Sequence, residues 1–524
     1  MCGIFGIVST EEVAQKITLG LYDLQHRGEQ AGGVVTSDGQ NQKDFKWSGL
    51  VTFAFADEEK SEEIFRRLSG RFGIGHTLYS TIGKGGEKKQ PQTFQPLIGN
   101  FHGQPFALGH NGNLIELEGL REEAEAKGYR FQSEISDTEV IVALLSTSPE
   151  KEFLEALRKT LPRLKGAFSL TILFKDKVIG VRDRFGIRPL CLGRDETSFI
   201  LASESCAFYT INANFIREIQ PGEIIVLGKN GIESSFIWAE NPQLKICIFE
   251  FIYFARPDSV LAGQSVSSYR ENAAINLAQE CPVDADIIIP VPESGRIYDK
   301  EFSWSLNIPT KEGIIRNRYF STKTFLTSRQ TDRRSLQRIK MHPLRRVVHE
   351  KRVCVTEDSV IRGNVAPEIV TMLWEAGAKE VHLRVFSSPI RHPCFLGIDM
   401  ATRAELVAAD LTVEEIGRRI IHVNSLGYLS VEGMIKASGL PKENLCLGCF
   451  TGEYPVEPPP NFDFKPPSQE GGYLFYYLNT LINNQLFTFS IIFAKIWGWV
   501  WASWERIFRS SSILFFFRPE INLL

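Results

Sequence analysis

The amino-acid sequence predicts an α/β protein in which a mixed amino-terminal part precedes a parallel-sheet domain. Up to about residue 235, β-rich segments such as 167–173 and 223–227 alternate with helical stretches and glycine turns, which is typical of sheets packed on helices. From about Lys245, buried β-branched runs are each followed by a helical stretch, which is typical of a parallel sheet. At about 100 to 200 residues per domain, the 524 residues suffice for two to four such units.

The overall composition indicates a globular protein rather than a disordered chain or a coiled coil. Hydrophobic residues make up 43% of the chain and charged residues 23%, and the mean hydropathy is −0.10. The 59 Lys and Arg residues nearly balance the 62 Asp and Glu residues, which gives a net charge of −3. Because this balance provides no basic field for a polynucleotide, nucleic-acid binding is not expected.

The chain contains nine cysteines and begins without the features of a secretory signal. Its apolar start, from Gly3 to Val8, is too short for the core of a signal peptide, and no basic residue precedes it. We therefore expect a cytoplasmic protein, in which clustered cysteines more often serve metal binding or catalysis than disulfides.

Cys2 follows the initiator methionine directly, so removal of Met1 would give this cysteine a free α-amino group. Such an α-amino group has a pKa of about 7.7 to 8.0, which is close enough to neutrality for it to take a proton from a thiol or from water. Taken alone, however, a cysteine here is more often a small buried thiol than a nucleophile.

Three histidine-containing segments, 24–28, 73–77 and 108–114, follow along the amino-terminal part. In the last of them, the side-chain NH2 of Asn111 and the backbone N–H of Gly112 have the chemistry of an oxyanion hole. An Asn-Gly pair is also typical of a hairpin turn, so both interpretations stay open for this dipeptide in isolation.

Five segments, in order, resemble the class II glutamine amidotransferases, which use an amino-terminal cysteine. They are Cys2-Gly3-Ile4-Phe5-Gly6, His26-Arg27-Gly28, Gly75-His76-Thr77, His110-Asn111-Gly112-Asn113 and Ser136-Asp137-Thr138-Glu139. The resemblance implies an N-terminal-nucleophile fold, a four-layer αββα sandwich, over residues 2–240. It also implies that Cys2 attacks the glutamine amide, that Asn111 and Gly112 stabilise the oxyanion, and that ammonia is released inside the protein. The glutamine-binding residues that it implies are Arg27, His76, Thr77 and Asp137, with Asp137 holding the α-amino group.

Position 78 departs from the pattern of that family. The family has an arginine after Gly-His-Thr, where it binds the carboxylate of glutamine, whereas this chain has Leu78. Leucine cannot form a bidentate, charge-assisted pair. We therefore expect weak glutamine binding unless another cation substitutes.

Three β-branched runs, 286–291, 352–356 and 380–385, are expected to form strands of the parallel sheet. Glu357 and Asp358 directly follow the second run, where ligands of such sheets bind. Two carboxylates suit ribose hydroxyls or hydrated Mg²⁺, and the backbone N–H groups of the following glycine turn suit phosphate. A charged strand end without a ligand is the alternative interpretation of this segment.

Four further segments resemble the amidophosphoribosyltransferase family, and with the amino-terminal motifs the resemblance runs from Cys2 to about Pro455. These segments are 249–259, 290–296, 316–319 and 397–400. The resemblance implies a type I phosphoribosyltransferase domain over residues 245–455, with a parallel sheet. It implies transfer of ammonia from glutamine to phosphoribosyl pyrophosphate, the first step of de novo purine synthesis, by a homotetramer.

The same resemblance implies roles for individual residues of this domain. Mg²⁺ would be held by Ser294, Glu357 and Asp358. Residues 316–346 are basic and poor in apolar residues, which by itself predicts a long flexible loop. With Arg316, Arg318 and Lys323, this loop would fold over the diphosphate and exclude water. The implied phosphoribosyl pyrophosphate-binding residues are Glu357, Asp358, Arg362, Gly363, Asn364, Arg316 and Arg318.

Val365 and Ala366 depart from this second pattern, because the family has hydroxyl side chains there that would hold the 5′-phosphate. The alternative to an active enzyme is a diverged paralogue that keeps the fold and serves as a binding or regulatory subunit. Leu78 and Val365 favour the paralogue, whereas the nucleophile, the oxyanion hole and the acidic pair favour the enzyme.

The pair Cys446-Leu447-Gly448-Cys449 is by itself compatible with zinc, with redox chemistry or with neither. The surrounding segments, 390–394 and 445–452, are similar to the iron–sulfur branch of the same family. The resemblance implies a structural [4Fe–4S] cluster held by Cys247, Cys394, Cys446 and Cys449. The other four cysteines are expected to pack as small apolar residues, namely Cys191, Cys206, Cys281 and Cys354.

Residues 456–524 lie beyond the resemblance and begin with a proline-rich linker. This tail has four of the eight tryptophans and 10 of the 37 phenylalanines. After Glu470 come 24 uncharged residues, but they include Asn483 and Asn484 and end at Lys495. A membrane span, an interfacial or packed aromatic segment, and a segment without a selected function all remain as interpretations.

Overall fold

The computed structural model describes residues 2–79, 94–133, 136–317, 338–363, 365–400, 402–460 and 462. Arg318, Lys323, Asn364 and residues 463–524 of the tail lie outside these ranges. In the described part, no helix is both long enough and apolar enough to span a bilayer.

Two antiparallel sheets and the helices beside them make up the amino-terminal part. The first sheet contains β1 (Gly3–Ser9), β2 (Ala31–Ser37), β3 (Gln42–Ser48), β4 (Phe72–Leu78), β9 (Cys191–Arg194), β10 (Ser198–Ala202) and β11 (Asn214–Glu218). The second contains β5 (Leu97–Phe101), β6 (Gln104–Ile115), β7 (Lys165–Phe174), β8 (Lys177–Arg182), β12 (Glu223–Gly228) and β13 (Gly231–Ile237). The helices are α1 (Ala14–Asp23), η1 (Gln25–Arg27), α2 (Val51–Ala54), α3 (Glu58–Arg67), α4 (Glu118–Ala126), α5 (Asp137–Ser146), α6 (Phe153–Thr160), η3 (Leu161–Arg163) and η4 (Ser205–Phe208).

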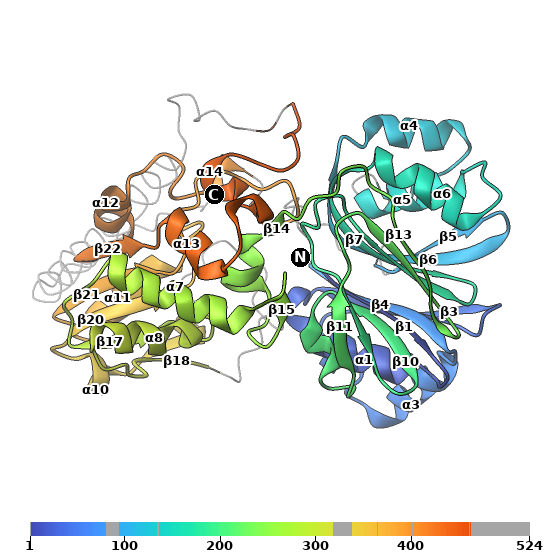
Figure 1. The fold of residues 1–524 in the computed structure, drawn as a ribbon. Coiled ribbons are helices and arrows are strands. Elements are labelled where there is room, and N and C mark those ends of the chain that lie inside the picture. Colours follow the sequence, from blue (N-terminus) through green and yellow to red (C-terminus); the bar gives the residue numbers. More distant parts are fainter. Residues whose placement is uncertain are drawn as a thin grey trace, which may run out of the picture. The chain divides into compact units, whose positions relative to one another are not determined.

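These elements form four layers. The strand order is β11-β9-β10-β1-β4-β2-β3 in the first sheet and β13-β12-β8-β7-β6-β5 in the second. Figure 1 shows α1 and α3 on the outer side of the first sheet and α4, α5 and α6 on the outer side of the second. The predicted αββα sandwich is therefore confirmed.

Strand β1 lies in the middle of the first sheet and is buried on both faces. Ile4 and Val8 pack in the core between the two sheets, whereas Phe5 and Ile7 pack in the core that contains α1. A strand covered on both faces carries apolar residues at successive positions. This position explains the apolar run at the start of the chain.

A four-stranded parallel sheet follows, in the order β17-β20-β21-β22. Its strands are β17 (Ile287–Pro290), β20 (Arg352–Glu357), β21 (Glu380–Val385) and β22 (Ser425–Tyr428). The three predicted strands of this sheet are confirmed as β17, β20 and β21. The longer helices around the sheet are α7 (Val266–Glu280), α8 (Arg296–Leu306), α11 (Ala366–Glu375) and α13 (Val431–Ser438), of which α7 packs on α8 and α13 (Figure 1).

Short elements complete this half of the chain. They are β14 (Ile246–Cys247), the π-helix η5 (Glu250–Phe254), β15 (Val260–Leu261), β16 (Gln264–Ser265), β18 (Ile314–Arg316), β19 (Met341–Pro343), α10 (Arg345–Val348), η7 (Arg403–Glu405), α12 (Val413–Glu415), the π-helix η8 (Ile416–Ile421), η9 (Lys442–Asn444), β23 (Leu445–Cys446) and α14 (Gly448–Thr451).

The expected long loop over residues 316–346 is shorter than the sequence suggested. Arg316 pairs with Met341 across the antiparallel strands β18 and β19, and α10 begins at Arg345. Backbone pairing therefore gives regular structure to both ends of this segment. Its basic composition did not indicate that it contains the strand β19. Residues 318–337, in its middle, lie outside the described ranges.

Candidate active sites

Cys2 lies at the start of β1, and the structure brings it beside Asn111 in the second sheet. The Cys2 backbone N–H donates to Asn111 Oδ1 at 3.1 Å, and the Cys2 thiol donates to the Tyr79 carbonyl at 3.6 Å. Cys2 is 7% exposed. Stacking of the two sheets thus joins two residues that lie 109 positions apart.

Asn111 and Gly112 lie inside strand β6, paired with Ser169 and Phe168 of β7. The hairpin-turn interpretation is therefore wrong. A Cβ atom on Gly112 would lie only 1.9 Å from the Ala167 carbonyl oxygen, so that only glycine fits this close strand pairing.

The Nδ2 group of Asn111 is buried and has no hydrogen-bond partner among the described residues. Its Oδ1 accepts from the Cys2 backbone N–H, so Nδ2, which belongs to the same carboxamide, lies close to the residue that carries the thiol. A buried donor without a partner is costly and rare in native structures. An oxyanion formed next to Cys2 would satisfy this donor.

Asp137 begins helix α5 and is held by backbone donors of two elements. Its carboxylate accepts from Thr138 N at 2.7 Å and from Leu114 N at 3.1 Å, at the end of the strand that carries Asn111. The imidazole of His110 lies 3.7 Å from this carboxylate. Burial lowers the pKa of His110, although Asp137 opposes the shift. His110 is therefore neutral at pH 7.

His76 and Thr77 are fully buried and bridge neighbouring elements. His76 Nε2 lies 3.1 Å from the His110 carbonyl, and Thr77 Oγ1 accepts from the Gly3 backbone at 3.2 Å. Both side chains therefore fix the strands around Cys2, and they do so from the core of the sandwich.

Leu78 lies in a small apolar cluster with Cys2, Ala31 and Phe94. The position where the family has arginine is thus an apolar wall beside the thiol. The guanidinium of Arg27 is also near Cys2, but it is engaged by the Glu204 and Glu250 carboxylates and by the Cys2 carbonyl. Arg27 is therefore a buried structural cation in this state.

A second candidate site lies at the carboxyl end of β20, where Glu357 ends the strand and Asp358 follows it. Burial raises the pKa of Glu357 well above its usual value, and the Asp358 charge adds to the shift. Burial also raises the pKa of Asp358, against hydrogen bonds from Ser294 and Ser359. Glu357 Oε2 is buried without a partner in the described part of the chain.

The loop after this acidic pair leads to helix α11. Gly363 has a φ of +62°, which favours glycine, and Pro367 lies in the first turn of α11, where a helix tolerates proline. Val365 at the N-cap gives no side-chain hydrogen bond. Arg362 is paired with Glu405 at 2.7 Å, whereas Arg316 is exposed.

Tyr79 and Asp399 link the two sites and were not predicted from the sequence. The Tyr79 hydroxyl donates to Asp399 at 3.4 Å, and Arg362 Nη2 donates to the Asp399 carbonyl at 3.0 Å. The Tyr79 carbonyl itself contacts the Cys2 thiol. Both residues stand in or beside segments used for the family resemblance, which is the signal that could have indicated them.

The structure gathers the four cysteines that the resemblance implied. Cys247 pairs in register with Cys446 across the parallel strands β14 and β23, Cys449 lies on α14, and the Cys394 thiol accepts from Leu396 N at 3.4 Å. Burial, and then the charges of the other three, raise the pKa of Cys449 well above its usual value. The four thiols are thus close enough to interact.

The donor set is sulfur, which suits an iron–sulfur cluster. The described residues contain no group of three or more side chains close enough to hold a single metal ion. The thiolates of a four-iron cluster each bind a different iron, so they need not converge on one point. The four cysteines that the resemblance assigns to a cluster are thus brought to one place in the fold.

Of the remaining cysteines, three are buried, as expected: Cys191, Cys206 and Cys354. Cys281 is only partly buried, and its thiol donates to the Tyr428 carbonyl at 3.5 Å.

Comparison with known proteins gives a consistent result. Residues 87–210 match a family model described as a glutamine amidotransferase domain. An amidophosphoribosyltransferase of Methanocaldococcus jannaschii is 44% identical over 476 residues, which cover 87% of this chain and 98% of the relative. An amidophosphoribosyltransferase of Bacillus subtilis is 40% identical over 461 residues, which cover 87% of this chain and 94% of the relative.

Solved structures resemble the chain over a similar length. A glutamine phosphoribosylpyrophosphate amidotransferase from B. subtilis, complexed with ADP and GMP, has a TM-score of 0.81 and 38% sequence identity. The match covers 88% of this chain and 99% of that one. A second structure, described as the allosteric regulatory enzyme of purine biosynthesis, has the same TM-score and identity and is covered to 98%.

Proposed function

This chain belongs to the amidophosphoribosyltransferase family, and we propose that its two candidate sites carry out the two halves of that reaction. Glutamine would be hydrolysed at Cys2, and the ammonia would be transferred to phosphoribosyl pyrophosphate at Glu357 and Asp358. The products are glutamate, pyrophosphate and 5-phosphoribosylamine. This reaction is the first step of purine biosynthesis. Among the residues that the structure describes, Asn111 Nδ2 beside Cys2 has no hydrogen-bond partner, and this observation supports the amidotransferase half most directly.

The chemistry at Cys2 follows from its position at the chain start. Once Met1 is removed, the α-amino group accepts the thiol proton and the thiolate attacks the amide carbon of glutamine. Asn111 Nδ2 and the Gly112 N–H would stabilise the negative oxygen of the tetrahedral intermediate. The proton returns to the leaving nitrogen, which departs as ammonia, and water then cleaves the thioester to glutamate.

The substrate would be oriented by its charged ends. Asp137 is the carboxylate available for the α-amino group, and His76, Thr77 and Arg27 support the strands around it. Leu78 leaves no cation at the position that binds the α-carboxylate in the family.

Replacing Leu78 with arginine is expected to lower the glutamine KM by about tenfold or more, because a charge-assisted bidentate pair replaces an apolar contact. Steady-state kinetics with glutamine measure this effect, and the KM for ammonia serves as an internal control. An unchanged glutamine KM in a folded variant would show that another group binds the carboxylate.

The phosphoribosyl half would use the end of β20. Ammonia attacks C1 of the ribose and the C1–O bond to pyrophosphate breaks. Glu357 and Asp358 would hold Mg²⁺ together with Ser294, since Mg²⁺ is usually bound by one or two carboxylates and by the phosphates of the substrate. The metal would neutralise charge on the leaving diphosphate.

Other groups of this half would bind the phosphates. The Gly363 turn and the backbone of the first turn of α11 are suited to the 5′-phosphate. Arg362 is placed between Asp399 and Glu405, and Arg316 lies at the start of the basic loop. Asn364 and Arg318 are assigned to the same substrate by family resemblance only.

We assign Cys247, Cys394, Cys446 and Cys449 to a structural [4Fe–4S] cluster. Changing Cys446 to serine should remove most of the iron and acid-labile sulfide, each expected at about four per chain in the wild type. Cys354→Ser is the matched control, because Cys354 is buried but lies outside this group. Purified wild type that holds zinc and lacks sulfide would overturn the assignment.

The remaining assignments are also proposals. The amidotransferase domain would span residues 2–240 and the phosphoribosyltransferase domain residues 245–455, with residues 456–524 as an appended tail of unassigned role. We propose a cytoplasmic homotetramer on the basis of family membership.

A coupled assay tests the function: pyrophosphate should be released from phosphoribosyl pyrophosphate with either glutamine or ammonia, and with neither nitrogen source only at background rate. Absence of release with both sources would contradict the proposed function and favour a diverged binding subunit.

A further inference from the structure

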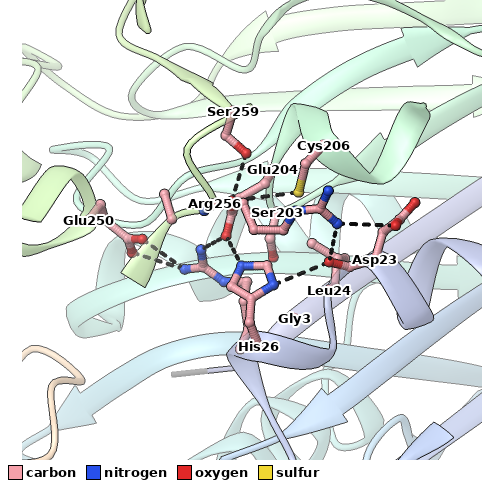
Figure 2. Close-up of polar contacts among 12 residues, drawn as sticks. Gly3, Asp23, Leu24, His26, Ser203, Glu204, Cys206, Glu250, Arg256 and Ser259 are labelled. Atoms are coloured by element: carbon pink, nitrogen blue, oxygen red, sulfur yellow. Dashed lines mark hydrogen bonds and ion pairs between the residues drawn. The ribbon is translucent and has the colours of Figure 1, made fainter. Parts of the chain in front are cut away.

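The Glu204 carboxylate is fully buried and is surrounded by donors from several segments (Figure 2). One oxygen lies 2.7 Å from His26 Nε2 and also accepts from Arg27. The other accepts from the Arg256 backbone N–H at 2.8 Å and from the Ser259 hydroxyl at 2.7 Å. Glu204 therefore joins the His26-Arg27 turn to the 256–259 segment.

The backbone places Glu204 close to the nucleophile strand. Strand β10 pairs with β1, and beyond it Ser203 N donates to the Ile4 carbonyl at 3.0 Å. The Ser203 hydroxyl in turn accepts from Ile4 N at 3.0 Å. Glu204 thus follows a segment that is fixed to β1 just after Cys2.

Arg27 connects this carboxylate to the nucleophile. Its Nε donates to the Cys2 carbonyl at 3.2 Å, one terminal nitrogen contacts Glu204, and the other donates to both oxygens of Glu250 at 2.9 and 3.0 Å. A planar guanidinium held on three sides has one orientation only. The position of the Cys2 carbonyl therefore depends on the two carboxylates.

We propose that Glu204 is a positioning residue for the Cys2 nucleophile, acting through Arg27. By fixing the guanidinium, Glu204 holds the Cys2 carbonyl and thereby the amino group and thiol of the same residue against Asn111. This inference rests on the proposed amidotransferase activity. The connection from Glu204 to Cys2 runs through the Arg27 guanidinium, so Glu204 acts on the position of the nucleophile.

The charge of Glu204 is essential to this role. Although burial opposes ionisation, His26, Arg27 and the hydroxyl of Ser259 hold the pKa of the Glu204 carboxyl well below its usual value. A glutamine at this position would place an NH2 group among partners that are themselves donors. One of the contacts would be lost, and the His26-Arg27 turn would shift.

The test compares Glu204→Gln with Glu223→Gln in the full-length protein. Glu223 is a matched control because it is also buried and is held by Arg217 through two hydrogen bonds of 2.8 and 2.7 Å, but it has no contact with Arg27 or Cys2 among the described residues. For Glu204→Gln, kcat with glutamine is expected to fall about 10- to 100-fold, since small displacements of a nucleophile have effects of this size. The glutamine KM and the ammonia-dependent rate should change by less than about twofold.

A fall of both the glutamine- and ammonia-dependent rates in Glu204→Gln, or an equal loss of glutamine kcat in Glu223→Gln, would show a purely structural role and overturn the proposal. If Glu204→Gln does not fold, Glu204→Asp keeps the charge at a shorter reach, and the same selective loss of kcat, of smaller size, is expected. A wild type without glutaminase activity would instead contradict the proposed function. The wild-type assay therefore distinguishes a failure of the proposed function from a failure of the role proposed for Glu204.

Discussion

A Cys2→Ala variant is expected to lose glutamine-dependent synthesis of phosphoribosylamine by about 10³-fold or more while it keeps the ammonia-dependent reaction. The thiol is the only group at the chain start that can form the thioester, and removal of a nucleophile has effects of this size in related acyl-transfer chemistry. Ammonia supplied from solution bypasses this step. Pyrophosphate release with each nitrogen source measures both activities.

Cys191→Ala is the matched control for this variant. Cys191 lies in the same half, is buried, and donates its thiol hydrogen to the Ala202 carbonyl. Burial raises the pKa of the Cys191 thiol well above its usual value, so this thiol is unreactive near pH 7. Equal losses of glutamine-dependent activity in the two variants would contradict the assignment of Cys2 as the nucleophile.

A Glu357→Gln variant is expected to lose phosphoribosyl transfer with glutamine and with ammonia alike, by about 10²- to 10³-fold, because one of the two carboxylates proposed to hold Mg²⁺ is removed. The magnesium concentration for half-maximal rate should rise as well. Glu380→Gln is a suitable control, because Glu380 lies on the neighbouring strand but at the amino end of the sheet, beside Arg352. Normal ammonia-dependent activity in Glu357→Gln would contradict the assignment.

The expected effect of Glu357→Gln on the stability of the metal-free protein is the opposite of its effect on activity. Burial raises the pKa of Glu357 above its value in the unfolded chain, so ionisation destabilises the folded state as the pH rises above about 4.3. Without metal, Glu357→Gln should therefore unfold at an equal or higher temperature than the wild type at pH 7, and the difference should vanish below about pH 4. Added Mg²⁺ should raise the Tm of the wild type more than that of the variant.

The strands were the part of the fold most accessible from sequence. The run 287–290 is buried on both faces, so its three consecutive isoleucines indicate a strand of a parallel sheet directly. The segment 341–343 was missed because its neighbours are basic, and its strand depends on pairing with 314–316. Local composition does not encode such a pairing.

The candidate amidotransferase site was harder to predict from the sequence, because it too depends on contacts between residues that are distant in the chain. Asn111 was ambiguous between a turn and an oxyanion hole until the pairing of β6 with β7 and the contact with Cys2 were known. The partners of Arg27 lie 177 and 223 positions away in the chain. No local pattern identifies Glu204 or Glu250 as those partners, and the resemblance to the family gave Arg27 a role without them.

If one chain releases ammonia at Cys2 and uses it at Glu357 and Asp358, nitrogen should pass from the glutamine amide to the product inside the protein. To measure this transfer, the protein is given glutamine labelled with ¹⁵N in the side-chain amide, together with phosphoribosyl pyrophosphate, Mg²⁺ and unlabelled ammonia. The ¹⁵N content of trapped phosphoribosylamine is then determined. The product is expected to carry the label at a higher fraction than the ammonia in solution does. Labelled ammonia in solution with unlabelled product, or release of glutamate without any product, would contradict this expectation.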